Sequence, residues 1–101
     1  MELPAFLKPL VVRRVIGASM APKLRPGQLI IATSLIRKLR PGQVVIVERD
    51  HKQFIKRIER IEDNHVFVIG DNLRASTDSR HFGWLGKEEI IAKVLRPNMA
   101  K

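Results

Sequence analysis

Apolar residues occur along this chain in short, β-branched runs that are separated by turn-forming residues. Runs of this length and composition, bounded by Pro-Gly and other turn-forming residues, are typical of β-strands. The last run also contains good helix formers, but its isoleucines and valine favour a strand. The predicted strands are Val11–Ile16, Gln28–Thr33, Gln43–Glu48, Gln53–Ile61, His65–Ile69 and Glu89–Leu95.

A six-residue sequence occurs twice, as Lys23–Gln28 and as Lys38–Gln43, and four apolar residues follow each copy. Proline presets the backbone of the second position of a turn, and glycine accepts the positive φ of the third. Each copy is therefore predicted to be a turn that leads into a buried strand. Several short strands with such turns predict an all-β sandwich or barrel. No linker divides the chain, so we expect one domain over residues 1–101.

Composition narrows the chemistry that this domain could perform. Hydrophobic residues make up 45% of the chain, which favours a folded protein. There is no cysteine, which excludes disulfides, thiolate nucleophiles and thiolate metal ligands. The histidines His51, His65 and His81 are too far apart to show a ligand spacing, so we expect no metal site and no cofactor. Any nucleophile must be a hydroxyl, an amine or a carboxylate.

The formal net charge of +9 favours acidic partners, such as nucleic acid or an anionic membrane surface. No block of five like charges occurs, so nucleic-acid binding is not the favoured function. The segment Leu3–Ile16 is interrupted by prolines and basic residues, and it has neither the length of a membrane span nor the order of a secretory signal. We therefore expect a cytoplasmic or peripheral membrane protein. The alternative is a domain trimmed from a longer, anchored one.

The first candidate for chemistry is Ser19, which follows a predicted strand and lies among small residues before Pro22. This position exposes a hydroxyl beside backbone N–H groups that could bind an oxyanion. The alternative is a turn serine that caps its local backbone.

The second candidate is Lys56. Side chains alternate along a strand, so Phe54, Lys56 and Ile58 share one face, and Ile55 and Arg57 share the other. If the first face is buried, desolvation lowers the pKa of the lysine and makes it a competent base. The alternative places Arg57 inward and Lys56 outward.

The third candidate segment is the polar stretch Gly70–Arg80, which follows an apolar strand. Asp78 and Arg80 could form a paired support, and Ser76 could accept a hydrogen bond from the lysine amine and aim it. An ordinary surface loop is the alternative. A Ser/His/Asp arrangement that uses His81 is formally possible, although the local spacing does not favour it.

Together and in this order, the three segments resemble the type I signal peptidase family of Ser/Lys proteases, which shares its catalytic fold with the LexA-type self-cleaving repressors. Gly17–Pro22 is similar to the family's nucleophile box, Phe54–Arg57 to its lysine box, and Gly70–Gly83 to its third box. LexA-type repressors lack the third box, so the resemblance favours the signal-peptidase branch. It covers about Val15–Val94 and implies coiled antiparallel sheets that are partly barrel-like.

The resemblance implies a serine endopeptidase in which Ser19 attacks the scissile carbonyl and Lys56 is the general base. It also implies that Ser76 holds the lysine amine, while Asp78 and Arg80 brace the site without reacting.

The resemblance further implies that the Ser19 backbone N–H forms part of the oxyanion hole. Some family members carry a hydroxyl two residues before the nucleophile, where this chain has Gly17, so only a backbone or water contribution is available there. We expect an extended substrate to add as a strand beside the site. Met20, Phe54 and Ile55 would then line a small apolar pocket for Ala-like residues before the cut.

Departures from the family pattern refine the resemblance. The family's membrane anchor is missing, and Ile58–Ile69 is too short to hold its accessory domain. Lys23, Gln28 and Gln43 replace a threonine and aspartates that are often found at those positions. The chain most resembles the short, soluble branch that matures nickel-containing superoxide dismutase, which would make its partner a precursor with a cleavable N-terminal leader. This does not imply that the chain itself binds nickel.

Three alternatives stay open. The first is a general signal peptidase domain without its anchor. The second is an inactive basic module that binds nucleic acid or a membrane surface. The third is a self-cleaving switch, for which the 18 residues before Ser19 are short.

Overall fold

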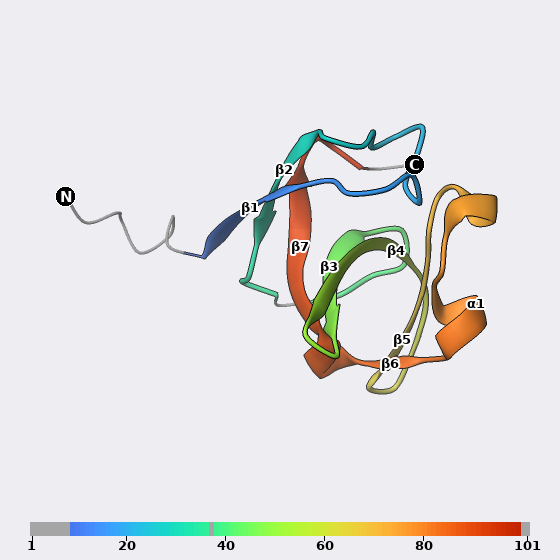
Figure 1. Cartoon of the computed structure of the whole chain (residues 1–101). Helices are drawn as coiled ribbons and strands as arrows, with labels where there is room; N and C mark the ends of the chain where they lie inside the picture. Colours follow the sequence, from blue (N-terminus) through green and yellow to red (C-terminus); the bar gives the residue numbers. More distant parts are fainter. Residues whose placement is uncertain (1–8, 37, 100–101) are drawn as a thin grey trace.

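A computed structural model describes residues 9–36 and 38–99, and over these ranges seven antiparallel strands form one sheet (Figure 1). The order across the sheet is β1-β2-β7-β3-β4-β5-β6. The strands are β1 (Leu10–Arg14), β2 (Leu29–Thr33), β3 (Val44–Arg49), β4 (Lys52–Glu62), β5 (His65–Ile69), β6 (Leu85–Gly86) and β7 (Ile90–Arg96). The predicted all-β class is confirmed. The strands belong to a single open sheet, because β1 and β6 stand at the two ends of its order.

The six predicted strands are all present, and none of their ends differs from the prediction by more than two residues. The two-residue β6 escaped prediction because it is too short to show a pattern. The helices η2 (Leu73–Ala75), α1 (Ser79–Phe82) and η3 (Lys87–Glu89) are single turns and were not predicted either. The predicted start of the last strand, Glu89, belongs to η3. No helix in the described ranges is long and apolar enough to cross a membrane.

Irregular pairing bends the sheet. The register shifts between Ile31 and Ala32 in β2, between Ile46 and Val47 in β3, and in β4 just after Ile58. Such bulges increase the local twist and bend a strand. Figure 1 shows β3 and β4 curving around the interior, so the sheet is curled without closing into a barrel.

The curled sheet encloses two groups of buried apolar side chains. The first group consists of Val15, Met20, Leu24, Ile30, Ala32, Val44, Ile46, Ala92, Val94 and Met99. The second consists of Val45, Val47, Ile58, Val66, Val68, Leu85 and Ile90. Met20 and Leu24 of the first group belong to the segment between β1 and β2, so this long connection is anchored to the core.

Both copies of the repeated sequence form the predicted turn. Gly27 has φ +87° and Gly42 has φ +93°, a region that glycine adopts without a steric penalty. In each turn the backbone N–H of the glutamine donates to the carbonyl of the arginine three residues earlier, at 3.1 Å in the first copy and 3.3 Å in the second. The glutamine side-chain oxygen also accepts from the backbone N–H of that arginine. The repeated glutamine therefore closes its own turn.

The two turns also hold equivalent backbone positions. The Gly27 N–H donates to the carbonyl of Val15, and the Val15 N–H donates back to the glutamine carbonyl, both at 2.8 Å. The second turn makes the same two bonds to Ile58, again at 2.8 Å. Val15 lies four residues before Ser19, and Ile58 lies two residues after Lys56. The repeat therefore fixes the backbone next to each candidate catalytic residue.

Arg57 of β4 is the largest fully buried side chain of the described residues, with 1% of its surface exposed. Its Nε and NH2 groups donate to the two carboxylate oxygens of Asp71, each at 2.8 Å. Its NH1 group donates to the backbone carbonyls of Gly42, at 2.7 Å, and Met99, at 2.6 Å. This guanidinium therefore ties β4 to the second turn, to the loop after β5 and to the segment after β7.

We expect Asp71→Ala to lower the free energy of unfolding by about 3–5 kcal/mol, because it leaves the Arg57 charge buried without a counter-charge. Urea titrations that follow the fluorescence of Trp84, the single tryptophan, measure this change. The control is Glu59→Gln, which removes the exposed Arg60–Glu59 contact and should cost less than about 1 kcal/mol. Equal losses in the two variants would contradict the structural role of the Asp71 carboxylate.

Candidate active site

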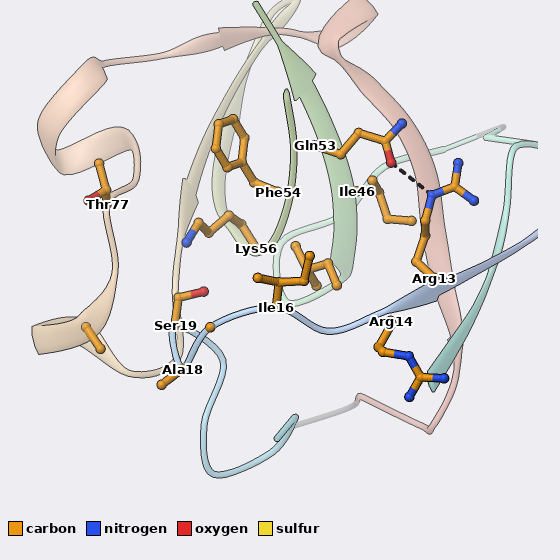
Figure 2. Close-up of a pocket in the computed structure, with 13 residues that line it drawn as sticks. Arg13, Arg14, Ile16, Ala18, Ser19, Ile46, Gln53, Phe54, Lys56 and Thr77 are labelled. Carbon is orange, nitrogen blue, oxygen red and sulfur yellow. Dashed lines mark hydrogen bonds between the residues drawn. The ribbon is translucent and has the colours of Figure 1, made fainter. Parts of the chain in front are cut away.

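A cavity of about 420 Å³ opens between β1, the turn that follows it, and β4 (Figure 2). Ser19 and Lys56 both line this cavity, although they lie 37 residues apart in the sequence. The other lining residues are Arg13, Arg14, Ile16, Gly17, Ala18, Ile46, Gln53, Phe54, Ile55, Ala75 and Thr77. The structure therefore brings the first two candidate boxes together at one site.

Two hydrogen bonds from the third candidate segment hold the turn that carries Ser19. It begins at Gly17, whose φ of +79° redirects the chain after β1. The carbonyl of Ser19 accepts the backbone N–H of Asn72 at 2.8 Å. The sulfur of Met20 accepts the backbone N–H of Asp71 at 3.4 Å. The third candidate segment thus holds the Ser19 carbonyl and the Met20 side chain, and Ser19 lines the cavity.

The prediction that Met20 lines a substrate pocket is wrong. Its side chain is 1% exposed and packs in the first core group, away from the cavity. The physical reason is that neighbouring side chains in this turn point in different directions, so that the Ser19 hydroxyl faces the cavity and the thioether anchors the turn in the core. Phe54 and Ile55, which were predicted to line the same pocket, do lie in its wall.

Lys56 is only 4% exposed, and its neighbour Arg57 is buried as well. The sequence left open which of the two faces inward. Both do, because Lys56, Arg57 and Ile58 are buried in succession, so this part of β4 is covered on both faces. Burial removes water from the Lys56 amine and lowers its pKa from the ordinary value of 10.5. The negative charge of Asp78 partly opposes this shift of the pKa, and the positive charge of Arg80 adds to it.

A short chain of hydrogen bonds runs from the lysine into the third segment. The Lys56 Nζ donates to the Ser76 hydroxyl at 3.1 Å, and this hydroxyl donates to the Asp78 carboxylate at 2.6 Å. The direction of the second bond is fixed, because an ionised carboxylate can only accept. The Ser76 oxygen must therefore accept a hydrogen bond from the amine. This bond sets the directions in which the other N–H groups and the lone pair of the Lys56 Nζ can point.

Asp78 is the hub of this network and is completely buried. Burial alone would raise the pKa of its carboxyl group. Hydrogen bonds from the Arg80 and Ser76 side chains and from the backbone N–H groups of Gly70 and Arg80 outweigh burial and hold the pKa well below its usual range. The Arg80 Nε lies 2.9 Å from one carboxylate oxygen, and the Gly70 N–H lies 2.9 Å from the other. The group therefore stays ionised at neutral pH.

Gly70 has a role that sequence reasoning missed. A Cβ atom at this position would overlap the Ser76 side chain and the backbone carbonyl oxygen of Ser19. Only glycine therefore lets the loop pass between the nucleophile turn and the group that holds the lysine. The Gly-Asp-Asn sequence was visible as a motif, but the reason for its glycine is a tertiary contact.

His81 is not part of the cavity wall among the described residues. Its Nδ1 accepts the backbone N–H of Asp78 at 3.2 Å and caps α1, which accounts for the residue without a catalytic role. Arg13 of β1 and Gln53 of β4, which also line the cavity, were not singled out from the sequence, because only the curl of the sheet brings β1 opposite β4. Within the described ranges, no group of three side chains could hold a metal ion.

A comparison with known protein families shows where this chain belongs. A family described as Peptidase S24-like matches residues 5–95, a range that includes Ser19, Lys56 and the whole Gly70–Arg80 segment. A comparison with curated proteins gives no match.

The Asp78 network predicts a pH dependence of stability. The folded-state pKa of Asp78 lies below its unfolded value of about 3.9. The stabilisation is therefore fully present above about pH 4 and is lost as the pH falls toward the folded-state pKa. Urea unfolding across an acidic pH series should show a steeper loss for the wild type than for Asp78→Asn, and Asp78→Asn should be less stable at neutral pH. Parallel slopes in the two proteins would contradict the assignment.

Proposed function

The chain belongs to the Peptidase S24-like family, and on that premise we propose that it is a serine endopeptidase with Ser19 as nucleophile and Lys56 as general base. One observation carries the proposal: a buried lysine amine with a lowered pKa shares a cavity with a serine hydroxyl. A normal lysine is protonated near pH 7 and cannot accept a proton, whereas a desolvated lysine can.

In this mechanism, the Ser19 Oγ attacks the scissile carbonyl while its proton passes to the Lys56 Nζ. A neutral amine has two N–H groups and one lone pair. Because one N–H donates to Ser76, the lone pair is free to turn toward the cavity. The protonated amine then delivers its proton to the leaving nitrogen, and a water molecule hydrolyses the acyl-enzyme with the same lysine as base. Asp78 and Arg80 hold Ser76 in place and take no part in the proton transfers.

The oxyanion is proposed to bind at the backbone N–H of Ser19. Gly17 lines the cavity but has no side chain, so it can contribute only through its backbone or through a bound water. The loss of one oxyanion-hole donor costs about 3–4 kcal/mol in well-studied proteases. A modest turnover number is the consequence we expect for this chain.

The substrate is proposed to be an extended segment that lies along the open edge of β1 and crosses the cavity toward Ser19. Ala18, Phe54 and Ile55 line the cavity together with Ser19 and leave room for a small side chain. We therefore expect an Ala-like residue just before the cleaved bond.

Within the family, we propose the signal-peptidase type of activity, which is removal of an N-terminal leader from a precursor. The support is the loop Gly70–Arg80, which supplies Ser76, Asp78 and Arg80 to the lysine in the way that the third box of that branch implies. The precursor of nickel-containing superoxide dismutase is the proposed substrate. The net charge of +9 supports an additional, peripheral contact with anionic membranes.

The proposal is tested by incubating a panel of leader-bearing precursors, including that of nickel superoxide dismutase, with the full chain and with Ser19→Ala and Lys56→Met. We expect site-specific cleavage by the wild type and a loss of at least about a thousandfold in each variant, because neither half of the dyad acts alone. Circular dichroism shows whether the variants fold. Folded wild type that cuts no precursor, or Ser19→Ala that cuts at the wild-type rate, would refute the assignment.

The pH profile offers an independent test of the base. The kcat/KM value should rise with pH as the amine loses its proton, with a midpoint below 10.5 because burial lowers the Lys56 pKa. The charge of Arg80 lowers this pKa, so Arg80→Gln should move the midpoint to higher pH. Lys93→Gln, which also removes one positive charge but lies outside the cavity wall, serves as the control. Identical midpoints in all three proteins would show that the ionisation does not belong to Lys56.

A further inference from the structure

The cavity has two chemically different ends. On the Ser19 side its wall includes the small side chain of Ala18 and the ring of Phe54, beside Lys56 (Figure 2). Toward β1 the wall becomes polar and basic, with Arg13, Arg14 and Gln53 (Figure 2). No acidic side chain lines the cavity among the described residues. A bound segment would therefore meet an apolar subsite at the reacting end and a positive one farther along.

Arg13 reaches across the cavity from β1 to β4. Its Nε donates to the side-chain oxygen of Gln53 at 2.9 Å, as Figure 2 shows, and its NH1 donates to the backbone carbonyl of Val12 at 2.9 Å. The Gln53 amide is itself fixed, because its nitrogen donates to Glu48 at 3.2 Å. The guanidinium is therefore held in one orientation by a neutral partner.

The charge of Arg13 is not neutralised inside the described part of the chain. Its two acceptors are an amide oxygen and a backbone carbonyl, and no carboxylate in residues 9–36 and 38–99 forms an ion pair with it. Arg57 and Arg80, by contrast, each pair with an aspartate. Arg13 is exposed at its end of the cavity, and a guanidinium there without a carboxylate partner among the described residues attracts a carboxylate with a matching geometry.

We propose that Arg13 is a specificity-determining residue that binds an acidic side chain of the substrate, several residues from the bond that is cut. This inference rests on the proposed protease function and names the substrate feature that the cavity selects. A segment lying along the edge of β1 toward Ser19 passes the guanidinium on its way. An aspartate or glutamate at that position forms a charge-assisted pair with Arg13, whereas an uncharged residue there binds without one.

Arg96 of β7 provides a matched control, because it is also an exposed arginine on a strand and lies outside the cavity wall. Its NH1 donates to the backbone carbonyl of Leu95 at 3.1 Å, as the NH1 of Arg13 does to that of Val12. Arg96→Gln therefore removes the same charge from the protein without changing the cavity wall or the bridge to Gln53.

The experiment uses peptides with alanine before the scissile bond. The peptides are identical except at one position, which holds glutamate, glutamine or lysine and is moved along the peptide step by step. With the full-length wild type, we expect one position at which glutamate raises kcat/KM about tenfold over glutamine. In Arg13→Gln this ratio should fall to about one, and in Arg13→Glu a lysine peptide should become the preferred one. Arg96→Gln should keep the ratio. A ratio that survives in Arg13→Gln, or that falls equally in Arg96→Gln, overturns the proposal.

A binding measurement separates this inference from the proposed activity. The same peptides, labelled with a fluorophore, are titrated with Ser19→Ala and with the double variant Arg13→Gln/Ser19→Ala. We expect the glutamate peptide to bind Ser19→Ala about tenfold more tightly than the glutamine peptide, and the double variant to bind both alike. If this preference is present while wild type cuts no peptide, the activity proposal fails and the Arg13 assignment stands. Equal affinities of Ser19→Ala for both peptides overturn the Arg13 assignment, even if cleavage occurs.

Discussion

Two adjacent basic side chains on β4 are buried, and the rest of the structure is arranged to supply their polar partners. Lys56 and Arg57 project to opposite faces of one strand, and both are almost fully removed from water. A buried charge without a partner costs several kcal/mol. One loop supplies both partners, because Asp71 pairs directly with Arg57 and Asp78 reaches Lys56 through Ser76. The same loop holds the backbone of the nucleophile turn, so charge compensation and site assembly depend on one segment.

Arg57 and Lys56 have different kinds of partner, and this difference is consistent with the proposed role of Lys56 as a base. The Arg57 guanidinium makes a two-pronged ion pair, which keeps it charged and structural. A direct ion pair at Lys56 would raise its pKa and keep it protonated. Instead, the Ser76 hydroxyl separates the amine from Asp78, and Arg80 shares the carboxylate charge. Desolvation can then dominate the lysine pKa, while every buried side-chain nitrogen and oxygen of the described residues keeps a hydrogen bond.

The structural role of the repeated sequence is visible only in the folded chain. Each Pro-Gly-Gln turn makes the same pair of backbone bonds, one to Val15 and the other to Ile58. These two residues belong to the segments that carry Ser19 and Lys56. Two copies of one turn therefore hold the segments that carry the two candidate residues. The curl of the sheet then brings Ser19, Lys56 and Arg13 to the wall of a single cavity.

The sequence by itself determined the all-β class, six of the seven strands, both turns and the three segments that form the site. It could do so because strand alternation, turn chemistry and short motifs are local properties of a few neighbouring residues. Tertiary structure alone decided that Met20 anchors the core, that Lys56 and Arg57 are both buried, and that Gly70 must lack a side chain. It also decided that Arg13 faces the cavity. These features depend on bulges and on contacts between distant strands, which leave no periodic signal in the chain.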